Sequence, residues 1–539
     1  MVAFEQTLIL LLLTTALSVV ARWAPWPRPI TYVLGGVAAG LLPGFPHVGL
    51  DPGFFFLCFL PPLLFSEGWL MPLREFSKAK RPIIFLATGL VVLTTLVVGL
   101  AAHWLVPGLP LPLAFALGAV ISPTDAVAVS AITAKLKVPV RVTTVLNGES
   151  LMNDATGLVA FKFALAALFA GTFSLRAATL QFLLMATGGL AVGLVVGYLV
   201  GKLRDGLIRT HNTDPLIEIT LSLLTPYAAY LTAEPLGISG ILAVVAAGLY
   251  SGWRDPVRMD AATRQTTWTV WSTVLFWLNG LAFVLLGLQF PDLLQAVHGE
   301  YPTLSLLGFV GGIAGVAMLL RLLWFFVASR LPFFLSAQVR KTEAPMTWQA
   351  LLVSGWAGMR GTVTLAAALS IPLTFPDGSP LGHRDLVIFL AFGVIATTLL
   401  IQGTTMGWLI RRLGLQEDST RQTEDQLARV TAVRAGLETL RQLENETLPP
   451  AKSAALRHIL AEYEARLSEL AAMGSTRLHA RDRRTSERNF RFAALEAERN
   501  AVDDLWKRNV ISDDVHRPLQ QLLDHEESML RAQPSQRGN

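Results

Sequence analysis

The sequence predicts an all-α membrane protein with about thirteen transmembrane helices and a soluble helical C-terminal tail. Of the 539 residues, 52% are hydrophobic and 15% are charged, whereas soluble domains carry about 25% charged residues. The mean hydropathy is +0.49. Basic residues alternate between the loops of the apolar part, and the composition changes to a charged one near residue 413. These three observations define a transmembrane domain at 1–412 and a cytoplasmic tail at 413–539.

The apolar runs have the length that a tilted membrane helix needs. Their approximate limits are 4–21, 30–46, 53–71, 82–106, 111–134, 149–172, 178–202, 213–232, 236–252, 267–290, 303–329, 345–371 and 384–411. The first run is predicted to be a retained span, because no Lys or Arg precedes it as in a signal peptide. The run at 213–232 is the least regular, since it contains Glu218 and Pro226.

Basic residues gather in every second loop, which the positive-inside rule assigns to the cytoplasm. These loops contain Arg22, Arg28, Arg74, Lys78, Lys80, Arg81, Lys135, Lys137, Arg141, Lys202, Arg204, Arg209, Arg254, Arg258, Arg264, Arg330, Arg340 and Lys341. The opposite loops contain only Arg176 and Arg384. The pattern predicts a multi-pass protein of the cell inner (plasma) membrane, with its N-terminus outside and its C-terminus in the cytoplasm.

Two spans are predicted to be broken inside the membrane. Pro123 interrupts the span at 111–134, and glycines flank Arg360 in the span at 345–371. If six-helix repeats at about 4–172 and 213–411 are inverted around a linker helix at 178–202, the two breaks occupy corresponding positions. Matched breaks of this kind point to a binding site between the two halves of a transporter.

Asp154 is the strongest candidate for a binding residue, because it lies inside an apolar run and a charge at that depth is costly. In a helix, Ser150 lies one turn before it on the same face. Asn153 is the neighbouring polar residue. Carboxylate and hydroxyl oxygens suit a hard cation such as Na⁺ or K⁺. A structural role for a buried, hydrogen-bonded Asp154 is the alternative.

Asp125 is a second acid in an apolar run and follows Ser122-Pro123-Thr124. Proline removes a backbone donor and breaks the helix, which frees carbonyls to meet an ion. Thr124 adds a hydroxyl group. A simple helix N-cap is the alternative role of Asp125. Asp154 and Asp125 are therefore the predicted metal ligands for Na⁺ or K⁺.

Arg360 carries a permanent charge inside a span and needs a buried partner. Glu149 is the preferred partner, and Asp154 or Asp125 is the competing choice. Glu67 is a third acid near a span end, which lines an access route for ions or lies in water at the interface. Lys162 either extends toward the interface or forms an internal pair.

Several classes of function are excluded or disfavoured. A single cysteine, Cys58, excludes an internal disulfide and a CxxC site. No basic patch alternates with aromatic residues, so no nucleic-acid partner is expected. No cofactor and no enzyme activity are expected, because phosphate-binding and serine hydrolase motifs are missing. An ion channel or receptor-like protein is the main alternative. An intramembrane aspartic protease, with two aspartates sharing a proton, is the least favoured.

The tail is predicted to be helical from two apolar stripes with helical spacing. The stripes are Leu427, Val430, Val433, Leu437 and Leu440, and Leu456, Ile459, Leu460, Tyr463, Leu467 and Leu470. The tail forms either a small soluble bundle or a pairing surface between subunits.

Taken together, the motifs resemble the first branch of the cation–proton antiporter superfamily, the monovalent cation–proton exchangers. The matching segments are Leu60-Pro61-Pro62, Ser122-Pro123-Thr124-Asp125, Gly148-Glu149-Ser150, Asn153-Asp154 and Gly358-Met359-Arg360-Gly361. The resemblance covers about residues 1–412. It implies a homodimer in the lipid membrane, with a dimer domain, a moving core domain and two broken helices that cross in the core.

The resemblance also implies roles for single residues. Asp154 would bind the cation or the proton, Asp125 and Thr124 would complete the site, and Ser150 would help to ligate. Glu149 would pair with Arg360. Asn153 beside Asp154 is similar to the electroneutral branch, and an amide that cannot titrate favours one proton per cation. Glu67 departs from the family pattern by one residue, which rotates a helical side chain by about 100°.

The sequence therefore predicts an electroneutral Na⁺ and/or K⁺/H⁺ antiporter that works by alternating access. The cation and the proton would compete for the buried Asp154.

Overall fold

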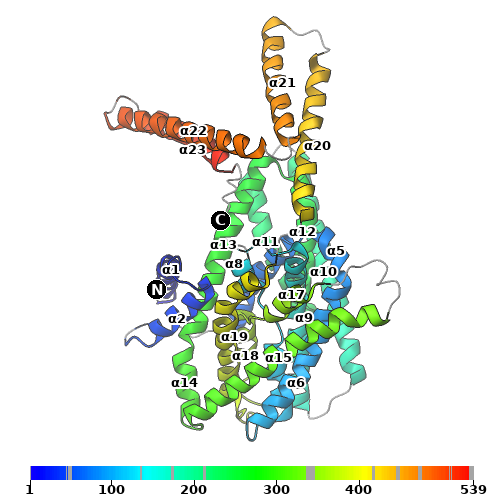
Figure 1. The fold of residues 1–539 in the computed structure, drawn as a ribbon. Helices are drawn as coiled ribbons and strands as arrows, with labels where there is room; N and C mark the ends of the chain where they lie inside the picture. Colours follow the sequence, from blue (N-terminus) through cyan, green and yellow to red (C-terminus); the bar gives the residue numbers. More distant parts are fainter. Residues whose placement is uncertain are drawn as a thin grey trace. The chain divides into compact units, whose positions relative to one another are not determined.

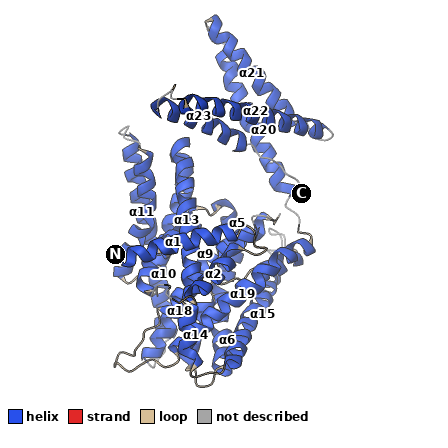
Figure 2. Ribbon diagram, turned by 90° about the vertical axis from the view of Figure 1, so that its left-hand side faces the viewer, coloured by secondary structure: helices blue, strands red, loops and turns tan. Residues whose placement is uncertain are grey.

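The computed structural model describes residues 2–43, 45, 51–133, 136, 138–170, 175–209, 214–335, 346–415, 419–444, 449–471, 476–508, 510 and 513–532. The chain separates into two compact units, Met1–Glu417 and Asp418–Asn539. Helices make up almost all of the described chain (Figures 1 and 2). The all-α fold class is therefore confirmed.

The first unit contains helices of very different lengths (Figure 1). They are α1 (Val2–Val20), α2 (Arg28–Gly40), α3 (Pro52–Cys58), α4 (Leu60–Trp69), α5 (Leu73–Ile84), the π-helix η1 (Phe85–Gly89), α6 (Leu90–Leu105), α7 (Leu111–Ile121), α8 (Ala126–Thr133), α9 (Val140–Ala170), α10 (Leu175–Arg209), α11 (Pro215–Ala233), the 3₁₀-helix η2 (Glu234–Leu236), α12 (Gly240–Arg258), α13 (Ala261–Leu288), α14 (Phe290–His298), α15 (Thr303–Leu335), α17 (Trp348–Trp356), α18 (Thr362–Leu369) and α19 (Arg384–Leu413).

Every predicted span overlaps one of these helices or a helix pair, but the count of thirteen membrane crossings stays a prediction. Among the described residues, 7 helices are long and apolar enough to cross a membrane. The structure also changes some limits. α9 begins at Val140, well before the predicted start at 149, and α14 was not predicted. The predicted breaks at Pro123 and Arg360 separate α7 from α8 and α17 from α18.

Several helices begin at residues whose side chains satisfy free backbone N–H groups, as N-caps do. Asp214 accepts a hydrogen bond from the Leu216 amide at 2.9 Å and starts α11. Asp260 accepts from the Thr263 amide at 2.8 Å and starts α13. These caps define the first residues of the two helices.

The helices of the first unit pack mainly in two groups. In one group, α10 runs along α12, α13 runs along α2, and α4 lies against α11 and α12. In the other group, α7 lies between α6 and α9, and α15 packs against α17 and α19. We call these the scaffold group and the core group. Both helix breaks belong to the core group.

A buried ion network ties the scaffold group together. Arg204 of α10 donates to Asp255 of α12 at 2.9 Å and lies 3.5 Å from Glu218 of α11. The Trp69 indole of α4 donates to the second Asp255 oxygen at 3.3 Å. Buried charges need such partners, because removing them from water is costly. Glu218, which makes the predicted span at 213–232 the least regular in sequence, is thus a structural residue of this network.

Gly193 gives a test of the packing between α10 and α12. A Cβ atom at this position would lie 2.0 Å from the carbonyl oxygen of Ala243, and that backbone atom has little room to move. We expect Gly193→Ala to destabilise the protein by about 1–3 kcal/mol, as overpacking does. Thermal unfolding of the purified protein in detergent measures the effect.

Gly206 in the same helix provides the matched control. A Cβ atom there would meet no atom within 4 Å. Gly206→Ala should leave the unfolding temperature unchanged or raise it, because alanine favours a helix by about 1 kcal/mol over glycine. Equal effects of the two substitutions would contradict the close contact.

The second unit contains two helical hairpins. One pairs α20 (Ser419–Glu444) with α21 (Pro450–Ala471), and the other pairs α22 (Thr476–Lys507) with α23 (Asp513–Ala532) (Figure 1). Leu437, Leu456 and Leu460 of the predicted stripes form a small core between α20 and α21. The stripes thus bury their apolar face within the hairpin, as amphipathic helices do.

Candidate cation-binding site

The two helix breaks meet and contact each other directly. The first break comprises Ser122 to Asp125, and the second comprises Ala357 to Gly361. The Asp125 amide donates a hydrogen bond to the Met359 carbonyl at 2.8 Å. A Cβ atom on Gly361 would lie 2.3 Å from the Asp125 carboxylate, so glycine is what allows this approach. The crossing is therefore held by backbone groups that the breaks release.

Two half-helices, α7 and α17, end at the crossing, and the C-terminal end of each is contacted by an arginine from another segment. Arg360 donates to the carbonyls of Ser122 and Pro123, the latter at 3.0 Å. Arg321 of α15 donates to the carbonyls of Ala357 at 3.1 Å and Ser354 at 3.4 Å. A helix C-terminus carries partial negative charge, so a guanidinium group stabilises it. The two arginines satisfy the carbonyls that would otherwise be orphaned inside the membrane.

The predicted ion pair between Glu149 and Arg360 is wrong. Glu149 accepts two hydrogen bonds from Arg321, one of them at 2.8 Å, and both side chains are almost completely buried. Arg360 uses its charge on backbone carbonyls instead. Arg321 was missed, although the signal was present: it is also a permanent charge inside a predicted span, at 303–329.

α9 supplies the polar side chains that face the first break. Ser150 donates to the Thr124 carbonyl at 2.6 Å, and Asn153 donates to the Thr124 hydroxyl at 2.9 Å. Asp125 caps α8 by accepting from the Ala128 amide at 3.2 Å. Asp154 is one residue further along α9 and is 5% exposed. The structure thus brings together all five residues of the predicted site.

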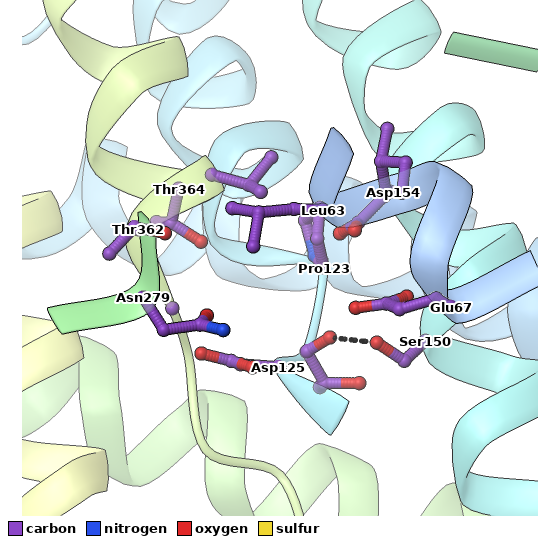
Figure 3. Close-up of a pocket in the computed structure, with 13 residues that line it drawn as sticks. Leu63, Glu67, Pro123, Asp125, Ser150, Asp154, Asn279, Thr362 and Thr364 are labelled. Atoms are coloured by element: carbon purple, nitrogen blue, oxygen red, sulfur yellow. Dashed lines mark hydrogen bonds between the residues drawn. The ribbon is translucent and has the colours of Figure 1, made fainter. Parts of the chain in front are cut away.

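A small cavity of about 30 Å³ opens where these elements meet. It is lined by Leu63, Leu64, Glu67, Pro123, Thr124, Asp125, Ser150, Asp154, Asn279, Gly361, Thr362, Val363 and Thr364. In Figure 3 the side chains of Asp154 and Glu67 lie on one side of it, and Asn279 and Thr362 lie on the other. Asn153 does not line the cavity. It contacts the lining through its hydrogen bond to the Thr124 hydroxyl.

Glu67 lines the cavity itself rather than only a route toward it. Its Oε2 atom is buried and has no hydrogen-bond partner among the described residues, which is unusual for a buried oxygen. Asn279 and Thr362 were not predicted. Asn279 could have been noticed as a polar residue in the middle of the span at 267–290. Lys162 is not part of the lining, since its Nζ lies 3.4 Å from Glu234 on the surface.

The cavity offers hard oxygen donors of several kinds. The lining includes the carboxylates of Glu67, Asp125 and Asp154 and the hydroxyls of Thr124 and Ser150. Within the described part of the chain, no group of three His, Cys, Asp or Glu residues is arranged to hold a metal ion. A cation in this cavity would meet hydroxyl as well as carboxylate oxygens, which are hard donors.

Most of the chain matches known proteins. The family model "Sodium/hydrogen exchanger, transmembrane" matches residues 8–412. A sodium, potassium, lithium and rubidium/H⁺ antiporter of Bacillus pumilus is 39% identical over 450 residues, which are 82% of this chain and 66% of that protein. A Bacillus subtilis antiporter with the same description is 36% identical over 98% of this chain and 78% of its own length.

Two further matches, one to a relative and one to a solved structure, cover nearly the whole of the matched protein. An uncharacterized Na⁺/H⁺ exchanger of Escherichia coli is 35% identical over 98% of each chain. The structure of the sodium proton antiporter MjNhaP1 from Methanocaldococcus jannaschii has a TM-score of 0.60 at 18% identity and covers 77% of this chain and 99% of that chain. This likeness shows a shared fold. The family consists of transporters and not enzymes, and this chain belongs to the sodium/hydrogen exchanger family.

Proposed function

We propose that the protein exchanges a monovalent cation, Na⁺ and/or K⁺, for a proton across the plasma membrane. One observation carries the proposal. Asp154, Asp125 and Glu67 line one small cavity at the point where two helix breaks cross. Carboxylates at such a place are costly unless they bind something, and the relatives are described as Na⁺/H⁺ or K⁺/H⁺ antiporters.

Asp154 is the proposed group for which the cation and the proton compete. Its carboxylate is buried and lines the cavity. A buried carboxylate is costly as a free charge, and either a proton or a cation removes that cost. The carrier would change its orientation only when a proton or a cation neutralises Asp154. This requirement alone couples the movement of one ion to that of the other.

We further propose an electroneutral exchange of one cation for one proton. Asn153 takes the position beside Asp154 and donates to Thr124. Since an amide does not titrate, it adds no second proton to the cycle. The arginines near the site are occupied by Glu149 and by backbone carbonyls, so neither is available as a proton carrier.

Alternating access would be a movement of the core group against the scaffold group, with inverted repeats at about 4–172 and 213–411. The cavity is suited to this, because α4 and α13 of the scaffold group line it together with α9 and α18 of the core group. A homodimer in the lipid bilayer, with the N-terminus outside and the C-terminus in the cytoplasm, completes the proposal.

Exchange in proteoliposomes that contain a pH-sensitive dye tests this function. Na⁺ and then K⁺ are added, first with the membrane potential clamped and then without the clamp. We expect a proton flux that requires a cation and does not change with the potential. A cation-dependent flux that follows the potential would contradict the one-to-one stoichiometry. Folded protein with no cation-dependent flux would reject the antiporter.

A further inference from the structure

Asn279 is a polar residue in the cavity wall that the proposed competition between cation and proton does not use. It lies in the second half of α13, is half-buried, and lines the cavity together with the three carboxylates. Figure 3 shows it on the side of the cavity away from Asp154 and Glu67. An amide at this depth is costly compared with an apolar side chain, so its position calls for a reason.

Packing alone does not give that reason. The Asn279 amide nitrogen donates to the Leu275 carbonyl one turn back, at 2.8 Å. This bond stays within α13 and holds no other helix. It also fixes the orientation of the amide, because the nitrogen must face the carbonyl that accepts its hydrogen. The side-chain oxygen is then the group that is left to act as an acceptor or as a ligand.

Close packing of α1 and α2 against α13 fixes the position of Asn279. The neighbouring residue, Gly280, packs so closely that a Cβ atom would lie 2.4 Å from the Thr14 methyl group of α1. Further along, α13 lies against α2 for much of its length. Asn279 therefore lines this cavity of about 30 Å³ from the scaffold group, while Asp125, Ser150 and Asp154 line it from the core group.

We propose that the Asn279 side-chain oxygen is a neutral ligand of the transported cation and that it determines which cation sizes the cavity prefers. This inference rests on the proposed function. An amide oxygen is a hard donor that suits such ions. Selection among them depends on cavity size, ligand number and rigidity. A ligand on a fixed wall limits the width of the site and so favours the smaller ion.

The amide also separates cation binding from proton binding. It does not titrate, so it adds affinity for the cation and none for the proton. Asn279→Ala should raise the KM for Na⁺ roughly tenfold, as expected for loss of one contact to a charged group. The rise should be smaller for K⁺ and Rb⁺, because the widened site still fits larger ions. The factor should be the same at every pH.

Three further variants sharpen the test in the proteoliposome assay. Asn279→Asp keeps an oxygen ligand but adds a titrating group, so it should retain cation binding and change the pH profile. Asn279→Ser keeps a shorter oxygen ligand and should fall between wild type and alanine. Ser272→Ala is the control on α13, because the Ser272 hydroxyl is exposed and bonds to Thr269 at 2.8 Å. It should leave every parameter unchanged.

The outcomes distinguish this inference from the proposed function. Wild-type protein without cation-dependent flux would reject the function itself. Wild-type exchange together with an unchanged ratio of Na⁺ to K⁺ KM values in Asn279→Ala would overturn the inference alone, whether or not the maximal rate falls. If the alanine variant does not fold, Asn279→Ser decides. A changed ratio supports the ligand role, and an unchanged ratio rejects it.

Discussion

Replacing Asp154 with asparagine is expected to reduce cation-dependent proton flux to the level of protein-free liposomes. The amide has nearly the same size and shape, so the packing of α9 against the cavity is preserved. It can carry neither the charge that binds a cation nor the proton that is exchanged for it. The flux is measured with a pH-sensitive dye in proteoliposomes, and folding is checked by gel filtration and thermal unfolding.

Two variants serve as controls for this prediction. Asp292→Asn changes an exposed aspartate of α14 that does not line the cavity, and it should exchange at the wild-type rate. Asp154→Glu keeps the carboxylate but moves it by one methylene group within a cavity of about 30 Å³. It should retain measurable exchange with weaker cation binding. Full activity of Asp154→Asn would reject Asp154 as the site of exchange.

The second large effect is expected on stability. Arg321 and Glu149 have side chains that are 1% and 0% exposed. Arg321→Met leaves the Glu149 charge buried without its partner, which costs about 3–5 kcal/mol. We expect a markedly lower unfolding temperature and a lower yield of folded protein. Thermal unfolding in detergent measures this effect.

A double variant distinguishes the loss of the ion pair from the change in size of the side chain at position 321. Adding Glu149→Gln to Arg321→Met removes the uncompensated charge and should recover most of the stability. Recovery remains incomplete, because Arg321 also donates to the Ala357 and Ser354 carbonyls. Lys162→Met, at a surface pair with 53% and 44% exposed side chains, should cost less than about 1 kcal/mol. Equal stability of Arg321→Met and wild type would contradict the buried pair.

Local sequence chemistry was sufficient to predict much of the fold. Pro123 and the glycines at 358 and 361 break their helices for reasons contained in a few residues. Hydrophobic length predicted thirteen spans, and each of them overlaps a helix or a group of adjoining helices. The start of α9 could not be found in this way, because Arg141, Thr143 and Asn147 are polar residues that precede the apolar run of the predicted span at 149–172. Helix boundaries are less certain than the presence of a helix.

The site shows the same division. Asp154, Ser150 and Asn153 lie within about one helical turn of one another, and the sequence spacing alone brings them together. The partner of Glu149 required a choice between arginines at 321 and 360. Both are permanently charged and lie in apolar spans. In the folded chain it is Arg321 of α15 that reaches Glu149 of α9. Asn279 belongs to a helix far from the motifs and needed the three-dimensional arrangement.

The most direct test of the central claim is the dependence of the cation KM on pH in wild-type proteoliposomes. If cation and proton compete for Asp154, the KM for Na⁺ should rise in proportion to the proton concentration on the acid side, while the maximal rate stays constant. Asn279→Ala should shift this curve without changing its shape. A KM that is independent of pH, with a maximal rate that falls as acid is added, would show separate sites and contradict the account.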